Sequence, residues 1–503
     1  MKKRVEIKRL PTGVPGLDEV LGGGVPEFSF NLIAGGPGCG KTTLAHQIMF
    51  ANATPDRPAL YITVVGEPPI KMLRYQQQYT FFDTTKLSES VRFVHLGDEL
   101  LDAGPERVLE RIIAEVESMS PGFVFVDSFR AIAGKASPME LQLFVQRLSL
   151  RLTSWEATTF LIGEYVEHEA ENNPVFTVAD GIIWLRQAVE RNSVVRRAQV
   201  LKVRGQAQIP GLHTFRISDG GLRIYPRLAN FARQRLKEPR ERKTTGIAGL
   251  DEMMGGGVPA GYCFMVAGPS GSGKSLLSTQ FILDGIEHGE PGVIAVFEKR
   301  PEEYLQTLPG ANKLAKMIDA GSLRMMYLRP LDLSVEETME EIQALVREIG
   351  AKRIAIDSLS GFELALAPGY REDFRESLYR MLGALTELGV TVIMTAELVE
   401  SYTELRLSPI GISFLTDAIV LQRYVEVRGA VARAMAVVKQ RGCAHSGELR
   451  EYTIDDSGIT MGESLGQYGQ VLTGVPLLGH DLERGALPRS KPKRRPPAKR
   501  RRR

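Results

Sequence analysis

One feature constrains this chain most: a glycine-rich loop of the phosphate-binding type occurs twice. Residues 34–43 read AGGPGCGKTT, and residues 267–276 read AGPSGSGKSL. Both contain the pattern G-x-x-x-x-G-K-[S/T], in which backbone N–H groups and a lysine surround phosphate oxygens. Each loop follows an apolar run and precedes a helical pattern, which is the context that the motif requires. The sequence therefore predicts two phosphate-binding sites.

The loops belong to a longer internal repeat. The segment TGVPGLDEVLGGGVP at 12–26 returns as TGIAGLDEMMGGGVP at 245–259, an offset of 233 residues. The same offset relates Lys41 to Lys274 and Glu164 to Glu397. Solenoid repeats are only about 20–50 residues long, so this offset indicates a duplicated domain.

Two domains and a tail are expected from this repeat. We predict domains at 1–235 and 236–485, joined through the charged segment FARQRLKEPRERK at 231–243. The tail, 486–503, is predicted to be disordered because it has almost no apolar residues and several prolines. Residues 489–503 hold ten Lys or Arg and no acid, whereas the whole chain carries only +3, so the remainder sums to −7. Such a tail could contact nucleic acid or another anionic partner.

The apolar pattern predicts the fold class. In each half, short apolar β-rich runs alternate with helical patterns, which is typical of an α/β fold with a mostly parallel sheet. The segments at 198–205, 214–218 and 222–226 look like an antiparallel extension. The main strands are expected at 28–34, 59–65, 123–127 and 158–163, and at 262–267, 293–297, 353–357 and 390–396.

Composition limits the class of protein further. Hydrophobic residues make up 43% and charged residues 24% of the chain, as in soluble globular proteins. An apolar run of about 18 residues is lacking, so no membrane span or membrane partner is predicted. The basic N-terminal segment has no apolar segment behind it, so no secretory signal is expected. Cys39, Cys263 and Cys443 lack metal-ligand spacing and are predicted to be reduced thiols of a cytoplasmic protein.

The chemistry of the loops assigns candidate phosphate ligands. The glycines let successive N–H groups face phosphate oxygens, the helix that follows presents its positive end, and the lysine reaches the β- and γ-phosphates. The predicted binding residues are Gly35, Gly36, Gly38, Gly40, Lys41, Thr42 and Thr43 in the first half, and Gly268, Gly271, Ser272, Gly273, Lys274, Ser275 and Leu276 in the second.

A Mg²⁺ ion is expected beside each loop. The hydroxyl that follows the loop lysine, on Thr42 or Ser275, is a predicted ligand. A second anchor is predicted at a strand that ends in aspartate, Asp127 in FVFVDS and Asp357 in IAIDS. An apolar run ending in aspartate can also be a plain strand terminus, but its place after a phosphate loop favours the metal role.

Four carboxylates at strand ends are candidates near the γ-phosphate. Glu67 in VVGEPP and Glu298 in VFEKRP follow the second strand of each half and could orient or deprotonate a water. The alternative is an exposed acid at a strand end. Glu164 and Glu397 end the fourth strands and are weaker candidates for sensing the γ-phosphate.

Two pairs of cations recur at matching places. Lys202 and Arg204 lie in LKVRG, and Lys439 and Arg441 lie in VKQRG. Residues i and i+2 of a strand share a face, so each pair points one way and suits an anion. A cation supplied by a neighbouring subunit can stabilise the transition state of phosphoryl transfer. The alternative is the solvated face of an edge strand.

Together these segments resemble the KaiC family of RecA-like ATPases in its two-domain form. The resemblance rests on TGxxGLDxxxGGGVP before each loop, the loops themselves, VDSF or IDSL, and KxRG after DGIIWL or DAIVLQ. It covers nearly the whole chain except the basic tail. It implies two tandem RecA-like P-loop NTPase domains that bind ATP and Mg²⁺ at the subunit interfaces of a homo-oligomeric ring, usually a hexamer. It also implies that the Lys/Arg pairs reach the neighbouring subunit's nucleotide.

The sequence departs from the clock members of this family after the second strand. Those members carry two consecutive glutamates there, whereas this chain has Gly66-Glu67 in the first half and Glu298-Lys299 in the second. Each site keeps one carboxylate, in different positions of the pair. Unequal hydrolysis by the two halves is therefore an open alternative.

A second departure concerns phosphorylation. The clock members phosphorylate themselves on an adjacent Ser and Thr of the second domain, and the matching segment GISFLTD has Ser413 followed by Phe414. One acceptor remains, so single-site autokinase activity at Ser413 is predicted, with Thr416 as a weaker candidate. The alternative for Ser413 is an ordinary loop hydroxyl.

Three functions remain in competition. The leading hypothesis is a ring-forming ATPase with autokinase activity that acts in signalling or timing. A RecA-like protein that handles nucleic acid is the first alternative, supported only by the basic tail. The second alternative is an interaction platform in which ATP joins subunits with little turnover.

Overall fold

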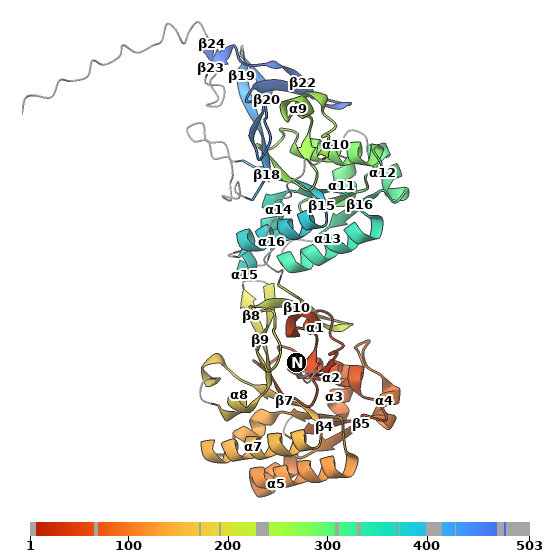
Figure 1. The fold of residues 1–503 in the computed structure, drawn as a ribbon, viewed down its shortest axis with the longest axis vertical. Helices are drawn as coiled ribbons and strands as arrows, with labels where there is room; N and C mark the ends of the chain where they lie inside the picture. Colours follow the sequence, from red (N-terminus) through yellow and green to blue (C-terminus); the bar gives the residue numbers. More distant parts are fainter. Residues whose placement is uncertain are drawn as a thin grey trace, which may run out of the picture. The chain divides into compact units, whose positions relative to one another are not determined.

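The computed structural model describes residues 7–64, 69–170, 173–190, 193–227, 241–306, 311–328, 333–366, 368–371, 373–398, 415–427, 429–469 and 477–478. These form two compact units, each built around a nine-stranded sheet (Figure 1). The first unit comprises Met1–Phe231, Arg329–Glu341 and Leu364–Met381, and the second comprises Ala232–Leu328, Ile342–Glu363 and Leu382–Arg503. The predicted boundaries at 235/236 and 485/486 and the tail at 486–503 lie outside the described residues.

The first sheet has the strand order β11-β10-β9-β8-β3-β7-β6-β4-β5. The six strands from β8 to β5 in this order pair in parallel, and β9, β10 and β11 add an antiparallel edge. The bounds are β3 Phe30–Gly35, β4 Ala59–Thr63, β5 Val91–His95, β6 Phe123–Asp127, β7 Thr158–Glu164, β8 Gly181–Glu190, β9 Ser193–Val203, β10 His213–Ser218 and β11 Gly221–Tyr225.

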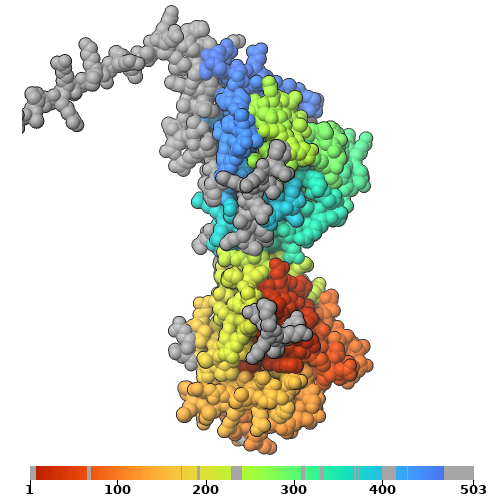
Figure 2. All heavy atoms as spheres, viewed as in Figure 1, coloured from red at the N-terminus to blue at the C-terminus, as the bar shows by residue number. Residues whose placement is uncertain are grey.

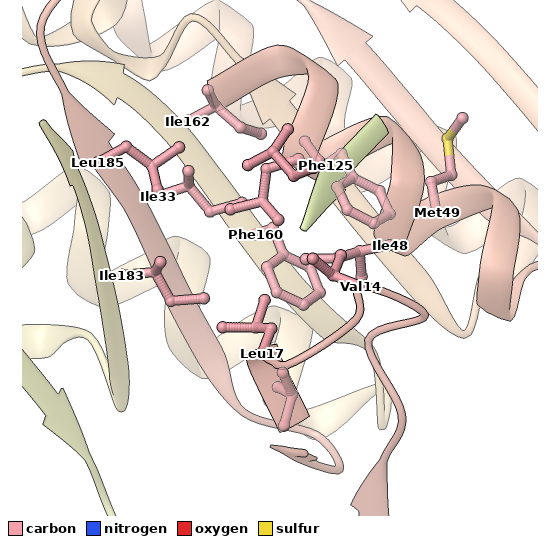
Figure 3. Packing of buried hydrophobic residues seen from close by; sticks show 14 of the residues in the cluster. Val14, Leu17, Ile33, Ile48, Met49, Phe125, Phe160, Ile162, Ile183 and Leu185 are labelled. Atoms are coloured by element: carbon pink, nitrogen blue, oxygen red, sulfur yellow. The ribbon is translucent and has the colours of Figure 1, made fainter. Parts of the chain in front are cut away.

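Helices cover both faces of the parallel strands, so these strands read as continuous apolar runs. Alternate residues point to opposite faces: Phe125 packs in the cluster under α2, and Val126 packs in the cluster under α5 and α7 (Figure 3 shows the first cluster). The outward faces of α5 and α7 form the orange surface of this unit in Figure 2. The helices are α1 Leu17–Leu21, α2 Lys41–Asn52, α3 Pro69–Gln76, α4 Thr84–Glu89, α5 Gly97–Met119, α6 Phe129–Ala133, α7 Pro138–Ser154 and α8 Pro174–Val178.

The second sheet repeats this topology in the order β16-β15-β17-β18-β14-β19-β20-β21-β22. Its strands are β14 Cys263–Gly268, β15 Gly292–Val296, β16 Leu323–Tyr327, β17 Arg353–Asp357, β18 Thr391–Glu397, β19 Ala418–Val427, β20 Ala430–Gln440, β21 Leu449–Asp455 and β22 Gly458–Ser464. The helices in this part of the chain are α9 Ala248–Met253, α10 Lys274–Glu287, α11 Pro301–Gln306, α12 Ala311–Asp319, α13 Val335–Ile349, α14 Leu359–Ala365, α15 Pro368–Arg371 and α16 Phe374–Glu387.

These sheets confirm the predicted α/β class with a mostly parallel sheet and an antiparallel extension. Each of the eight main strands lies within two residues of its predicted bounds. The edge strands β5 and β16 were not predicted, because half-exposed residues interrupt their apolar pattern. Within the described ranges, no helix is long and apolar enough to cross a membrane. Cys39, Cys263 and Cys443 form no disulfide within the described part of the chain.

Candidate functional site

The first phosphate loop connects β3 to α2 and depends on its glycines. Gly40 precedes α2 with φ 96°, and a Cβ there would lie 2.7 Å from the Ile217 side chain. A Cβ on Gly35 would lie 2.1 Å from the Leu185 carbonyl oxygen. Side chains are thus excluded where β3 turns into the loop, which leaves the backbone N–H groups accessible to a phosphate.

The second loop has the same form between β14 and α10. Gly271 and Gly273 have φ of 75° and 97°, in the left-handed region that favours glycine. Ser272 is fully buried and donates to the Pro269 carbonyl at 2.8 Å. The other predicted loop positions lie in the same two segments, with Thr43 and Leu276 buried in the first helical turns and Gly36 and Gly38 open to added atoms.

The loop lysines are held over the loops by backbone carbonyls. Lys41 Nζ donates to Gly36 O at 2.7 Å, and Lys274 Nζ donates to Pro269 O at 2.7 Å. Burial lowers the pKa of Lys274, and the acids around it, first Glu397, oppose that shift. Each lysine therefore occupies one position, from which its charge can meet a phosphate oxygen.

In the first half, the predicted metal ligands lie together. Thr42 Oγ1 donates to Asp127 Oδ2 at 2.9 Å, and the Tyr61 hydroxyl donates to the same oxygen at 2.8 Å. Burial raises the pKa of Asp127, and the hydrogen bonds from Tyr61 and Thr42 oppose that rise. A cation beside this carboxylate would favour its charged form.

In the second half, Asp357 has a different partner. Thr395 Oγ1 donates to Asp357 Oδ1 at 2.5 Å. The second oxygen, Oδ2, is buried and has no hydrogen-bond partner within the part of the chain that the structure describes. Tyr304 from α11 bonds Thr279 at 3.1 Å, and burial together with the Asp357 charge raises its pKa well above the usual range.

These residues fit a magnesium ion. Neighbouring oxygens of an octahedral Mg²⁺ shell are about 2.9 Å apart, since each Mg–O distance is about 2.0–2.1 Å. Thr42 Oγ1 and Asp127 Oδ2 have that separation, and the partnerless oxygen of Asp357 is an available ligand. The described residues contain no group of three or more His, Cys, Asp or Glu that could cage a metal. One carboxylate, one hydroxyl, phosphate and water make the usual magnesium site of a nucleotide.

The strand-end acids lie at the same edge of the sheet as the loops. Glu298 lies two residues after the end of β15, is exposed, and accepts a hydrogen bond from Ser358 Oγ at 2.5 Å. Glu164 Oε1 lies 3.8 Å from Lys41 Nζ, and Glu397 pairs with Gly268 in the equivalent register. Glu67 lies outside the described residues. Ser358, which positions Glu298, was not singled out from the sequence, although its signal is the serine shared by VDS and IDS.

The Lys/Arg pairs lie at the opposite end of each sheet from their own phosphate loop. Lys202 pairs with Ile182 of β8, and Ile182 in turn pairs with Leu32 of β3. Leu32 lies three residues before Gly35, so Lys202 is about 10 Å along the strand direction from the start of the loop. Lys439 is level with Met265, again three residues before Gly268.

Both pairs are held in the same way, by contacts that the sequence did not identify. Lys202 Nζ donates to Thr177 O at 3.1 Å, and Arg204 donates to Asp180 at 3.0 Å. Asp180 also accepts from Phe30 N, which fixes it at the start of the sheet.

In the second half, Lys439 Nζ donates to Thr416 O at 2.6 Å, and Arg441 lies 3.9 Å from Asp417. Asp417 likewise accepts from Cys263 N. The only signal for these aspartates was their repeated place in DGIIWL and DAIVLQ.

The two predicted phosphoacceptors differ in what the structure describes. Ser413 lies outside the described residues. Thr416 is fully buried. Phosphorylation of Thr416 would therefore require local opening of this segment.

Comparison with known proteins identifies the family. The family model for the KaiC ATPase matches residues 10–229 and again 243–466. The circadian clock oscillator protein KaiC of Rippkaea orientalis is 29% identical over 496 residues, which cover 93% of this chain and 92% of that protein. The corresponding proteins of Prochlorococcus marinus (strain MIT 9313) and Synechocystis, the latter named KaiC 1, are each 28% identical and cover 95% and 94% of this chain and 98% and 92% of their own length. This chain therefore belongs to the KaiC family of ATPases, with one ATPase domain in each half.

Proposed function

We propose that this ATPase works as a homo-oligomeric ring, a hexamer by its family resemblance, with ATP and Mg²⁺ bound between subunits. The observation that carries the proposal is the position of the Lys/Arg pairs. Each pair lies about 10 Å or more from its own loop along the sheet, with its arginine largely exposed, at 61% for Arg204 and 49% for Arg441. A cation at that distance from its own loop does not reach the nucleotide held there, which supports a role at the nucleotide of a neighbouring copy of the chain.

The residues of each site have separate roles in binding and hydrolysing ATP. The loop backbone and Lys41 or Lys274 hold the β- and γ-phosphates, and Thr42 with Asp127, or Ser275 with Asp357, would hold Mg²⁺. The ion, when bound, neutralises charge on the β- and γ-phosphates. Glu298, oriented by Ser358, is placed to accept a proton from an attacking water in the second site. Glu67 would take this role in the first site.

A mixing experiment tests the shared site. Lys274→Ala silences the second loop in every protein used. On that background, one variant carries Lys41→Ala and another carries Lys202→Ala with Arg204→Ala. Each alone should hydrolyse ATP at no more than about a hundredth of the rate of Lys274→Ala, because an arginine finger contributes 10³–10⁵ in rate. Mixed rings should recover activity, since an intact loop then meets an intact Lys/Arg pair. Absence of recovery in co-assembled rings would contradict the proposal.

We further propose single-site autokinase activity and a role in signalling or timing. The relatives named above are circadian clock oscillator proteins, and this chain keeps Ser413 and Thr416 in the matching segment. Purified protein is incubated with γ-labelled ATP, and label is followed in free phosphate and in protein. Label retained on protein at Ser413 or Thr416 supports the autokinase, whereas free phosphate with unlabelled protein contradicts it. If ATP binds and neither product forms, the interaction platform is the better description.

A contact of the basic tail with nucleic acid is a second candidate activity, supported by ten cations within 489–503. Deletion of 486–503 tests it. Binding that disappears with the tail, and that in the full chain also disappears at moderate salt, identifies a non-specific electrostatic tether. Binding that survives deletion would favour a nucleic-acid-handling ATPase. We place the protein in the cytoplasm, in keeping with three cysteines that form no disulfide among the described residues.

A further inference from the structure

The two strand-end aspartates, Asp127 and Asp357, each receive a hydroxyl from inside the sheet, but from opposite neighbours. Tyr61 on β4 donates to Asp127 Oδ2, and Thr395 on β18 donates to Asp357 Oδ1. Strand β6 lies between β7 and β4, and β17 lies between β18 and β15. By the repeat, β4 corresponds to β15 and β7 to β18. The donor therefore comes from one side of the aspartate strand in the first half and from the other side in the second.

At two equivalent positions, the halves have exchanged a hydroxyl-bearing residue for an isoleucine. The offset of 233 places Ile294 of the second half where the first has Tyr61, and Ile162 of the first half where the second has Thr395. The register agrees, because Asp127 pairs with Ile162, and Ile356 pairs with Met394 one residue before Thr395. At these two positions of the flanking strands, each half thus has one hydroxyl and one isoleucine, in exchanged places.

Packing fixes both hydroxyl donors. The Tyr61 ring is fully buried and stacks on Phe125 at 5.8 Å between centroids, and Phe125 stacks on Phe160 at 5.0 Å. His46 from α2 closes the other side of Tyr61, with an edge contact at 4.6 Å. Phe125, Phe160 and Ile162 belong to this one cluster (Figure 3). Thr395 is also fully buried, and its β-branched side chain has restricted rotation.

We propose that Tyr61 and Thr395 are positioning residues that orient the Mg²⁺-binding carboxylate, each in its own half. The inference rests on the Mg²⁺ role proposed above for Asp127 and Asp357. A hydroxyl that occupies one lone pair of a carboxylate fixes the direction of the remaining ones, so the cation meets a ligand already in place. Partners of metal ligands commonly contribute 10–100-fold to metal affinity. The two sites therefore have separate determinants of metal affinity, and one can be weakened without the other.

Manganese binding tests this without relying on turnover. The full chain, saturated with ADP, is titrated with Mn²⁺, and free ion is measured by electron paramagnetic resonance. Wild type should bind two Mn²⁺ per chain. Tyr61→Phe should weaken one of them about tenfold and leave the other unchanged. Thr395→Val should weaken the other one, and Thr395→Ser, which keeps the hydroxyl, should not.

Two further variants separate positioning from packing. Tyr165→Phe removes a buried hydroxyl of the same half that has no hydrogen-bond partner among the described residues, and Mn²⁺ affinity should stay unchanged. Tyr61→Phe combined with Ile162→Thr supplies the hydroxyl from the other strand, as in the second half, and should restore the lost affinity.

The outcomes distinguish failure of the proposed metal sites from failure of the proposed positioning roles. Wild type that binds no Mn²⁺ with ADP contradicts the proposed metal sites themselves. Two bound ions with unchanged affinity in both Tyr61→Phe and Thr395→Val overturn the positioning roles. Equal weakening by Tyr165→Phe, or a failure of Ile162→Thr to restore affinity, shows that packing rather than the hydroxyl is responsible and also overturns them. If Tyr61→Phe does not fold, the pair Thr395→Val and Thr395→Ser decides the matter.

Discussion

At the scale of single residues, the two ATPase domains differ most in the hydrogen bonding of their buried polar side chains. His46 on α2 is fully buried against Tyr61 and Phe93, and neither ring nitrogen has a hydrogen-bond partner among the described residues. Its counterpart by the repeat, Thr279, bonds the Tyr304 hydroxyl. The helix after the first loop thus contains a histidine that must stay neutral.

His46 makes stability depend on pH. Burial lowers the pKa of His46 to about 3, against a usual value of 6.5. Below pH 6.5 the unfolded chain therefore binds a proton that the folded chain does not, and stability falls by up to about 1.4 kcal/mol per pH unit toward pH 3. His46→Leu should show a shallower loss between pH 6.5 and 4.5. Urea unfolding followed by tryptophan fluorescence measures it, because Trp155 and Trp184 both lie in the first half. Equal slopes in the two proteins would contradict the prediction.

The side chains packed beneath the two phosphate loops also differ between the halves. The single hydroxyl proton of Ser272 is shared between the Pro269 carbonyl at 2.8 Å and Gln422 Oε1 at 3.0 Å, and the Ser272 and Gln422 side chains are fully buried. The first half has Cys39 and Leu185 in these places. We expect Ser272→Ala to destabilise the protein by about 1 kcal/mol more in wild type than in Gln422→Leu, because the bond is already absent in the latter. A double-mutant cycle by thermal unfolding gives this coupling, and a value near zero would show that the bond contributes nothing.

At the scale of elements, strand β17 begins with a buried cation that its counterpart β6 lacks. Arg353 is 1% exposed and donates to Glu290 at 2.7 Å and Asp284 at 3.0 Å. It also donates to the carbonyls of Thr244 and Phe281, so it joins the start of the second half to α10 and β17. The equivalent residue of β6 is Phe123.

Loss of this cation should destabilise the second half selectively. Arg353→Met leaves the partly buried Asp284 without this cation and leaves Glu290 with Lys243 alone, and loss of a buried ion-pair partner costs about 3–5 kcal/mol. The circular dichroism transition, which reports the whole chain, should gain an early phase, while the tryptophan transition of the first half should not move. Arg324→Gln, which breaks the exposed pair with Glu348, is the control and should change stability by less than about 1 kcal/mol. Coincident shifts of both probes would contradict separate unfolding.

At the scale of the whole molecule, duplication has produced two sites of unequal construction. In the first, Asp127 has two hydroxyl donors, whereas in the second Asp357 keeps a buried oxygen without a partner among the described residues. A preformed site suits a structural nucleotide, and a less satisfied one suits regulated chemistry. We therefore expect Lys41→Ala to impair ATP-dependent assembly more than Lys274→Ala does. Light scattering in the presence of ATP measures assembly, and equal assembly of the two variants would count against this division.

The sequence by itself determined the duplication, the phosphate loops, the fold class and the main strands. These follow from local pattern, because a parallel strand buried on both faces must be apolar along its length and a phosphate loop must be glycine-rich. The placement of Thr42 beside Asp127 was predictable for the same reason, since the loop after β3 and the end of β6 lie at the same carboxyl edge of the sheet.

Only the tertiary structure decided which residue completes each site. Tyr61 and Thr395 are ordinary members of apolar strands in the sequence, and their hydroxyls reach an aspartate because strand order sets their neighbours. The Lys/Arg pairs were found as a pattern, but their place at the far end of the sheet depends on the antiparallel return of β9 and β20. Contacts between strands distant in the chain are set by the strand order of the whole sheet, and no local pattern carries that information.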